Sequence, residues 1–443
     1  MSKIDPKPEK PPAREPSDWR YFDAPDLEAE MKRVFEICHG CRMCVNYCGS
    51  FPDVFGRIDR DIETKDADGA ELLDADDFKA TTDLCWQCKL CYIKCPYTAD
   101  EGHEWQVDVP RLLMREKVNR AQRNGVALVD KALGEPGQMG QMASGALAPL
   151  MNLVNANRLT RKVNEKVLGI SSEFLLPPFA KTSFAKWLDN HVPLEEAGQN
   201  GTVAMFATCL CDYNFPSVAA NAVRVLEKNG YKVVRPAQVC CGIPNLDGGD
   251  LPAAIQKAKT NVASLLREIE AGHTVVVPQP TCSYTIRKEY PELLPGDDAR
   301  KVSAGVVDLM EFLDKLRKEK KLNREFKSGL GKVAYHAPCH LRAQKIGYPG
   351  ARVLGVLPDT EVEMVEQCSA VDGTWGMKAE YYEMGRKYAQ KLVRGIDDAE
   401  AKTVLTDCQL AGQRIKKENG VDAKHPVEAL AEAYGIAIGV DGT

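Results

Sequence analysis

The sequence lacks an apolar run long enough to cross a membrane, and it lacks the motifs of several common enzyme classes. Its longest uncharged stretch, residues 136–157, is interrupted by Gly, Pro, Asn, Gln and Ser, so it falls short of a transmembrane helix. No complete G-x-G-x-x-G or P-loop occurs, and Gly329-Leu330-Gly331 is only a fragment of one. We therefore expect no flavin or nicotinamide site in this chain. A net charge of −5 gives no basis for nucleic-acid binding, which uses a clustered basic face.

The N-terminal segment also lacks the apolar core of a secretory signal peptide. Residues 1–25 are rich in proline and charge, a composition that predicts a disordered tail. The 443 residues suffice for about two to four domains. Sixteen cysteines in a long chain without a signal peptide indicate metal thiolates in a reducing compartment rather than disulfides. We expect a cytoplasmic protein, with peripheral contact to the inner face of the membrane as an open alternative.

Two cysteine runs of the form C-x2-C-x2-C-x3-C stand near the N-terminus. The second run ends in Cys95-Pro96, as in bacterial two-cluster ferredoxins. Three thiolates two residues apart can wrap one 4Fe-4S cluster, whereas the fourth lies too far along the chain and ligates the other cluster. Zinc also binds C-x2-C pairs but would leave cysteines over in each run. The predicted ligands are Cys38, Cys41, Cys44 and Cys95 for one cluster, and Cys48, Cys85, Cys88 and Cys91 for the second.

A long acidic insert separates the two cysteine runs. It contains Asp59-Arg60-Asp61 and Asp74-Ala75-Asp76-Asp77. Small two-cluster ferredoxins join their halves with short strands and turns. By analogy of fold, the longer insert with helical flanks favours the mainly α-helical ferredoxin module of respiratory iron–sulfur subunits. We expect this two-cluster domain to cover residues 26–110.

Residues 111–200 predict a helical connector without metal-ligand residues. Its apolar side chains fall near helical spacing, beside Arg158, Arg161, Lys162 and Lys166. This pattern suits an interfacial helix on a membrane or a partner, or a helix packed on the protein's own domains. The second interpretation is favoured, because amphipathic helices usually face a core. The apolar residues are Met139, Met142, Leu147, Leu150, Met151, Val154, Leu159, Val163 and Val167.

The C-terminal part contains an internal repeat that shows best in its cysteines. Each copy has three short apolar strands, each followed by a cysteine-bearing loop and a helix, which predicts a parallel α/β unit. The cysteines then lie at the carboxyl ends of strands, where open α/β sheets place their sites. The expected domains are residues 201–325 and 331–443, so the fold class is α+β and multidomain. Cys209, Cys240 and Cys282 recur as Cys339, Cys368 and Cys408, displaced by 130, 128 and 126 positions.

The pattern Cys209…Cys240-Cys241-Gly242…Cys282 resembles the cysteine-rich CCG domain. That domain is shared by the catalytic subunit of heterodisulfide reductase, the iron–sulfur subunit of glycolate oxidase and the C-subunit of anaerobic glycerol-3-phosphate dehydrogenase. The last resembles this chain most, and the resemblance covers nearly the whole sequence. It implies that the two repeats bind further iron–sulfur clusters. It also implies a subunit that passes electrons between a flavoprotein and a quinone or another acceptor. The strings His336-Ala337-Pro338-Cys339-His340 and Asp372-Gly373-Thr374-Trp375-Gly376 look like those of that subunit.

The first repeat keeps enough cysteines for a third 4Fe-4S cluster. Where heterodisulfide reductase has C-x2-C, this chain has Thr285 in the second cysteine position, so a fifth ligand is absent. Cys211 is either a substitute ligand or a buried thiol, and we favour the buried thiol. The predicted ligands of the third cluster are Cys209, Cys240, Cys241 and Cys282.

The second repeat keeps only three of the corresponding cysteines, namely Cys339, Cys368 and Cys408. Three alternatives stay open for it. It holds a cluster with one non-cysteine ligand, it holds a cluster with an open iron that invites substrate, or it is a degenerate structural copy. The candidate non-cysteine ligands are His336, His340 and Asp372, whereas His191, His273 and His425 are interpreted as structural.

Two functions are compatible with these features. In the first, three or more clusters relay single electrons, with a flavoprotein dehydrogenase as partner. Chains with this altered second repeat also resemble a group associated with rubrerythrin, which makes that diiron protein a candidate acceptor. In the second, the chain is itself a disulfide or thiol reductase that works at a CCG cluster. The incomplete ligand sets disfavour the reductase, so the sequence predicts an electron-transfer subunit without its own substrate site, and it identifies no catalytic residue.

Overall fold

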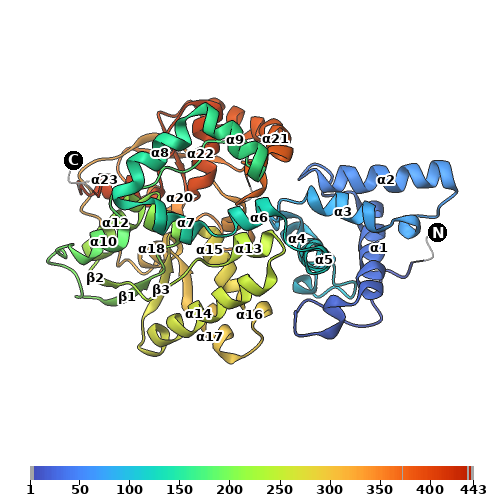
Figure 1. The fold of residues 1–443 in the computed structure, drawn as a ribbon. Helices are drawn as coiled ribbons and strands as arrows, with labels where there is room; N and C mark the ends of the chain where they lie inside the picture. Colours follow the sequence, from blue (N-terminus) through green and yellow to red (C-terminus); the bar gives the residue numbers. More distant parts are fainter. Residues whose placement is uncertain (1–3, 372, 437–438, 441–443) are drawn as a thin grey trace. The chain divides into compact units, whose positions relative to one another are not determined.

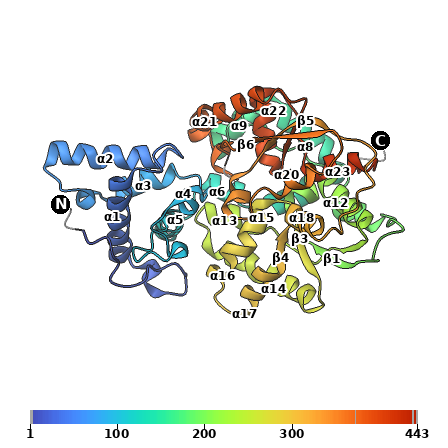
Figure 2. The ribbon, with the colours of Figure 1, turned by 180° about the vertical axis from the view of Figure 1, so that it is seen from behind.

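The computed structural model describes residues 4–371, 373–436 and 439–440. It divides into two compact units. The first comprises Met1–Lys131 with Asn245–Ala253, and the second comprises Ala132–Pro244 with Ala254–Thr443. The first unit is helical and the second contains two parallel sheets surrounded by helices (Figures 1 and 2). The predicted α+β multidomain fold is therefore confirmed.

The first unit is built from helices with clear start and stop signals. The Asp23 side chain caps α1 by accepting a hydrogen bond from the Asp26 backbone N–H, and Asp74 and Asp77 form a capping box at α3. The acidic insert is therefore largely helical, as the analogy with the α-helical ferredoxin module predicts. The elements are η1 (Trp19–Phe22), α1 (Ala24–Cys41), α2 (Ser50–Lys65), η2 (Ala70–Leu72), α3 (Ala75–Asp83), α4 (Leu90–Lys94), η3 (Ala99–Glu101) and α5 (Val109–Asn124).

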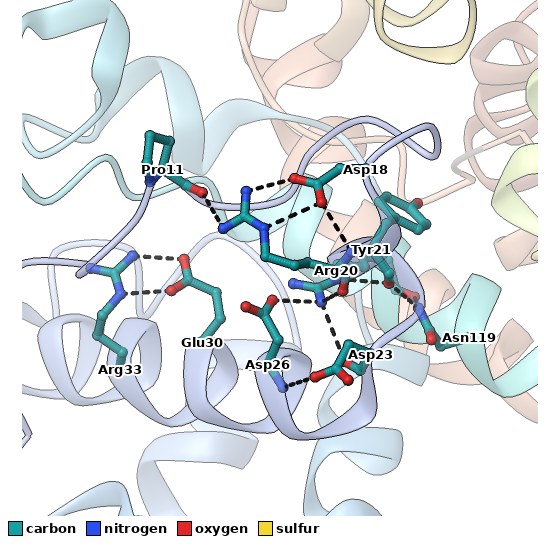
Figure 3. Close-up of polar contacts among 10 residues, drawn as sticks. Pro11, Asp18, Arg20, Tyr21, Asp23, Asp26, Glu30, Arg33 and Asn119 are labelled. Atoms are coloured by element: carbon teal, nitrogen blue, oxygen red, sulfur yellow. Dashed lines mark hydrogen bonds and ion pairs between the residues drawn. The ribbon is translucent and has the colours of Figure 1, made fainter.

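The segment before α1, for which a disordered tail is expected, instead packs against the helices of its unit. Figure 3 shows Arg20 donating to the Pro11 carbonyl, at 3.0 Å, and Asn119 donating to the Tyr21 carbonyl, at 2.8 Å. The buried Arg115 also donates to the Tyr21 carbonyl, at 2.9 Å. In these contacts, side chains of α5 donate hydrogen bonds to main-chain oxygens of the segment. Composition alone predicted disorder because it contains no information about contacts between residues far apart in the sequence.

The helix α5 completes the first unit, so the connector begins later than residue 111. Leu112, Leu113 and Val118 of α5 are buried. The short segment Asn245–Ala253 joins the same unit, although it follows the second strand of the repeat in sequence. Gly249 explains part of this placement, because it has a φ of +81° and a Cβ there would lie 2.9 Å from the Lys117 carbonyl oxygen.

Two parallel sheets carry the two copies of the repeat in the second unit. The first has the strand order β2-β1-β3-β4 and the second has the order β6-β5-β7. All of their strand pairs are parallel, which confirms the predicted parallel α/β repeats; β4 is an edge strand that the sequence analysis does not anticipate. The strands are β1 (Gly201–Met205), β2 (Tyr231–Val234), β3 (Thr274–Val277), β4 (Val306–Asp308), β5 (Gly331–His336), β6 (Thr360–Val365) and β7 (Thr403–Thr406).

The two repeats share one hydrophobic core. Met205 of β1 and Tyr335 of β5 belong to the same buried cluster, and Ser217 of α12 donates to Glu428 of α23 at 2.7 Å. The helices of the first repeat are α11 (Cys209–Tyr213), α12 (Pro216–Lys228), α13 (Ile243–Asp247), α14 (Leu251–Glu270), α15 (Pro280–Tyr284), the π-helical turn η5 (Thr285–Glu289), α16 (Tyr290–Leu293), α17 (Asp297–Gly305) and α18 (Leu309–Lys318). Those of the second are α19 (Cys339–Ala343), α20 (Pro349–Leu354), η6 (Trp375–Met377), α21 (Ala379–Asp398), α22 (Gln409–Asn419) and α23 (Pro426–Ala433).

The connector helices expose their apolar side chains instead of burying them. Leu153 is 66% exposed and Leu159 is 75% exposed, so the favoured interpretation of a core-facing stripe is wrong for most of these residues. The helices are α6 (Leu128–Leu133), α7 (Pro136–Ala143), η4 (Gly145–Leu147), α8 (Ala148–Ala156), α9 (Arg158–Leu168) and α10 (Phe184–Asp189). We call the exposed set the α7–α9 apolar face: Met139, Met142, Leu147, Leu150, Leu153, Leu159, Val163 and Val167. None of the helices in the described part of the chain combines the length and apolar character needed to span a bilayer.

Candidate iron–sulfur sites

The first cysteine run meets Cys95 around one small, mainly apolar cavity of the first unit. Helix α1 ends at Cys41, and the left-handed conformation of the next residue, Arg42 (φ 51°), changes the direction of the chain. Helix α4 ends at Lys94, and Cys95 is its C-terminal capping residue. Phe51 and Phe55 of α2 form part of the apolar wall. The four predicted ligands on this cavity are Cys38, Cys41, Cys44 and Cys95.

A second cavity of the same unit collects the other four cysteines of the two runs. Gln87 and Lys89 both have positive φ, at 49° and 62°, which lets the chain curl around the site. The Gln87 backbone N–H lies 3.4 Å from the Cys85 sulfur, and its side-chain amide lies 3.5 Å from the same atom. Such N–H groups stabilise negative charge on a ligand sulfur. The predicted ligands on this cavity are Cys48, Cys85, Cys88 and Cys91.

Cys48 and Cys95 therefore each leave their own run and enter the cavity of the other run. The two cavities are neighbours, because Phe51 lines both of them. The structure thus brings together the two crossed groups of thiols that the spacing predicts. This arrangement suits two adjacent clusters within one unit.

The crowding of these thiols fits a bound metal cluster. Burial raises the pKa of Cys38 well above the ordinary thiol value, and the neighbouring Cys95, Cys44 and Cys41 raise it further. Burial likewise raises the pKa of Cys91. Several thiolates can share such a small apolar space only if cations offset their charge, as the irons of a cluster do.

The first CCG-type repeat places its cysteines at the carboxyl edge of the first sheet, as predicted for a parallel α/β unit. Cys209 begins α11 after β1, and its sulfur lies 3.9 Å from that of Cys240 in the loop after β2. Thr208, directly before Cys209, has a φ of 62°, an unusual conformation for a β-branched residue. Cys209, Cys240, Cys241 and Cys282 all line one cavity of about 230 Å³.

Three of these thiols, Cys209, Cys240 and Cys241, interact through hydrogen bonds. Hydrogen bonds with Cys209 and Cys241 hold the pKa of Cys240 well below its ordinary value. The same bonds raise the pKa of Cys209 and of Cys241. Negative charge therefore concentrates on one sulfur that its neighbours stabilise, a donor set suited to a cationic metal group.

Helix α7 of the connector lies against two of these cysteines. A Cβ at Gly137 would lie 3.7 Å from the Cβ of Cys240 and 3.9 Å from that of Cys209. A Cβ at Gly140 would lie 2.5 Å from the ring of Tyr213, so only glycine permits this approach. The sequence analysis missed this contribution of the connector. The pair of glycines three residues apart is the signal that could have found it.

Cys211 does not line the cavity of about 230 Å³ among the residues described for its wall. Its side chain is fully buried in the core with Phe184 and Met205. Burial raises the pKa of the Cys211 thiol. This position fits the buried thiol that the sequence analysis favours.

The three cysteines of the second repeat do not share that cavity. Cys408 lines it beside the cysteines of the first repeat, whereas Cys339 and Cys368 are not among the described residues of its wall. Cys339 begins α19, and the sulfur of Cys368 accepts a hydrogen bond from the Ala370 N–H at 3.2 Å. The cavity therefore groups Cys408 with the first repeat.

Two of the three candidate non-cysteine ligands, His336 and His340, already have protein partners. The two ring nitrogens of His336 lie 2.9 Å from the Thr406 hydroxyl and 3.1 Å from the Gln367 carbonyl, and burial lowers its pKa to about 4. His340 Nδ1 lies 3.1 Å from the Thr281 hydroxyl. Asp372 lies outside the described residues.

The remaining predicted histidines occupy structural positions. His191 lies 2.9 Å from Glu227, and His273 lies 2.9 Å from Glu268. His425 caps α23 through a hydrogen bond from the Val427 N–H. This is the helix start that the following proline indicates.

Two buried carboxyl groups near the sites escaped the sequence analysis. Asp308, at the start of α18, lies 3.3 Å from the hydroxyl of Ser283, next to Cys282 in sequence. Asp407 directly precedes Cys408 and accepts a hydrogen bond from Tyr335. Burial raises the pKa of Asp308 to about 8 and that of Asp407 to about 7. No local pattern marks them, because their burial results from the packing of the two repeats.

Comparison with protein families matches both parts of the chain. The cysteine-rich domain family CCG matches residues 203–287 and 333–411. The chain therefore contains two regions that match the CCG cysteine-rich domain. A second family, the Fer4-like domain of citrate utilization protein B, matches residues 31–124. The predicted ferredoxin-like and CCG regions are therefore confirmed as domains of these families.

Several known proteins are similar in sequence to this chain. The C-subunit of anaerobic glycerol-3-phosphate dehydrogenase of Escherichia coli is 29% identical over 300 residues, which cover 66% of this CCG-domain protein and 73% of the relative. Lactate utilization protein A of Geobacillus kaustophilus is 27% identical over 253 residues, 52% of this chain and 98% of the relative. An uncharacterized iron–sulfur protein of Methanococcus maripaludis is 27% identical over 264 residues, 56% of this chain and 49% of the relative.

Proposed function

We propose that this CCG-domain protein is an electron-transfer subunit of an oxidoreductase. Two ferredoxin-type 4Fe-4S clusters and at least one CCG-domain cluster would relay single electrons through it. The main support for this proposal is that the predicted ligands line three separate cavities, with four predicted thiols on each. The similarity to a dehydrogenase subunit and to a lactate utilization protein supports the same function.

The chain's own residues would hold the clusters and control their surroundings. When bound, each cluster supplies a site that accepts and releases one electron. Cysteine thiolates orient it, and the amide groups of Gln87 favour the more negative state by donating toward the Cys85 sulfur. Around the third site, Gly140 would let α7 approach the Tyr213 ring closely, which places Gly137 of the same helix against Cys209 and Cys240.

Both ends of the relay require another molecule. A flavoprotein dehydrogenase is the proposed donor, and a quinone or a protein such as rubrerythrin is the proposed acceptor. The apolar lining of the third cavity supports an apolar acceptor, since Leu133, Met139 and Leu176 belong to it. Met139 also belongs to the α7–α9 apolar face, so this exposed face adjoins the wall of the cavity.

Anaerobically purified protein is expected to contain about twelve iron atoms, four for each of three clusters. Once reduced, it should pass electrons to a quinone analogue or to a protein acceptor in anaerobic stopped-flow measurements, and it should not cleave small disulfides alone. The main alternative is a disulfide or thiol reductase acting at the CCG cluster. Cleavage of a small disulfide by the isolated, reduced protein would contradict the electron-transfer proposal and support the reductase.

We also propose that the α7–α9 apolar face contacts the surface of an anionic membrane. The exposed Arg158, Lys162 and Lys166 lie on the same helix as Leu159 and Val163, a combination suited to acidic lipid headgroups. Each such cation contributes about 1 kcal/mol near an anionic bilayer.

Vesicle sedimentation tests this contact. The protein should bind vesicles containing phosphatidylglycerol and bind neutral phosphatidylcholine vesicles less. The double variant Lys162→Glu and Lys166→Glu should weaken binding by roughly 30-fold or more, from about 1 kcal/mol lost per cation. Val192, which is 82% exposed outside this face, provides the control variant Val192→Asp, which should bind normally. Equal loss in the control, or no binding by the unaltered protein, would contradict the contact.

A further inference from the structure

Two loops from different repeats are joined next to their cysteines. One loop follows β3 and leads to Cys282, and the other follows β7 and contains Cys408. The Gln279 side chain, three residues before Cys282, donates a hydrogen bond to the side chain of Gln409, the residue after Cys408. Both glutamines are buried. The interaction therefore holds the two cysteine loops together in a dry environment, where such bonds are hard to replace by water.

A second interaction fixes the same pair of loops. Nε2 of the buried His425 lies 3.0 Å from the carbonyl oxygen of Pro278, at the end of β3. His425 in turn is tied to the second sheet through its neighbour Lys424, whose N–H donates to the Val404 carbonyl of β7 at 3.0 Å. The carboxyl ends of β3 and β7 are thus connected at a second point, next to the first.

The result is a cavity with five cysteines on its wall. Cys408 is the one contributed by the second repeat, and it shares the wall of the cavity with Cys282. The corresponding position in the first repeat offers no further thiol, because Thr285 stands three residues after Cys282. The five cysteines are Cys209, Cys240, Cys241, Cys282 and Cys408.

We propose that Cys408 is a ligand of the iron–sulfur cluster of the first repeat, as a fifth thiolate supplied across the repeat boundary. The inference rests on the proposed third cluster and goes beyond it, since it removes Cys408 from the ligand set of the second repeat. Cys339 and Cys368 would then be left as two cysteines without the third thiolate that a cluster there needs. The second repeat would then contribute a ligand to the cluster of the first repeat and would hold no cluster of its own.

The fifth thiolate adds negative charge to the cluster. Because the net charge of a cluster and its ligands helps set the reduction potential, removing Cys408 should raise the potential of the third cluster. The Cys408→Ser variant should therefore show an altered EPR signal for that cluster and a higher midpoint potential in an anaerobic redox titration. The ferredoxin signals should stay unchanged. Cys368→Ser is the matched control from the same repeat, and it should leave all three signals unaltered.

Three results would overturn the proposal. An unaltered potential and EPR signal in Cys408→Ser, with about twelve irons retained, would refute the fifth ligand while leaving the third cluster intact. Equal changes in Cys368→Ser would assign Cys408 to a separate cluster of the second repeat. Only about eight irons in the unaltered protein would remove the third cluster itself, and with it the proposed relay beyond the ferredoxin domain.

Alkylation of the unaltered, cluster-loaded protein tests the same proposal without a variant, so the test does not depend on whether Cys408→Ser folds. Cys339, Cys368 and Cys408 are all half-buried, so the iron-free protein provides the reference reactivity toward iodoacetamide for each of the three thiols. In the cluster-loaded protein, mass spectrometry should find Cys408 protected and Cys368 alkylated. Removal of iron with a chelator should then expose Cys408 to the reagent. Alkylation of Cys408 in the loaded protein, with the third cluster still present, would refute the proposal.

Discussion

Replacing Cys241 with serine is expected to abolish the third cluster and to leave the two ferredoxin clusters in place. Cys241 is buried on the wall of its cavity and hydrogen-bonded with Cys240. A serine there provides no thiolate for iron, and Cys408, the fifth thiol on the wall, is already engaged as a proposed ligand. Iron content should fall from about twelve to about eight atoms per chain. Iron analysis and EPR spectroscopy on the anaerobically prepared variant provide the measurement.

The neighbouring Cys211 provides the control for this experiment. It lies in the hydrophobic core behind the site, so Cys211→Ala should keep about twelve irons and the EPR signals of all three clusters. Loss of the third cluster in Cys211→Ala would make Cys211 a ligand. Loss of the ferredoxin signals in Cys241→Ser would show that the variant disrupts the protein more widely than the structure implies.

The second large effect concerns the crossed ligation in the ferredoxin domain. Cys95 lies on the cavity of the first run, so Cys95→Ser should remove the cluster of that run and about four irons. Adding Cys41→Ser to this variant should remove no further iron, because both residues would belong to one cluster. Adding Cys88→Ser instead should remove about four more, since Cys88 lines the other cavity.

The two double variants also exclude the uncrossed alternative. If Cys95 ligated the cluster of its own run, the effects would be reversed, and Cys95→Ser with Cys88→Ser would lose only about four irons. Iron analysis distinguishes the outcomes directly. Circular dichroism of the helical domain would verify that each variant folds. This comparison works because neighbouring substitutions within one site are not additive, whereas those in separate sites are.

Much of the third site was predictable from local signals. Cys209, Cys240 and Cys282 each lie in the segment that follows a short strand, and parallel strands bring their carboxyl ends to one edge. The grouping of Cys209, Cys240 and Cys282 followed from that rule. The contribution of Gly137 and the pairing of Gln279 with Gln409 did not, because they depend on how distant helices and loops pack.

For the connector helices, the sequence predicted the helical face correctly but not its burial. The spacing of Leu159, Val163 and Val167 correctly predicts one face of a helix, but the face is solvated instead of buried. Periodicity determines which side chains share a face, whereas the neighbouring elements determine what covers that face. In α9 the side chain that turns inward is the cationic Arg161, which donates to the Phe174 carbonyl at 2.9 Å.

The sequence by itself determined the chemistry of this protein: the spacing of its cysteines, their two crossed groups and the repeated α/β pattern that presents the later ones. These are short-range properties, since a strand, a turn and a thiolate spacing are set within a few residues. Only the tertiary structure decided that the N-terminal segment is packed, that the α7–α9 apolar face is exposed and that Cys408 lies with the cysteines of the first repeat. Each depends on contacts between residues far apart in the chain, which local pattern does not encode.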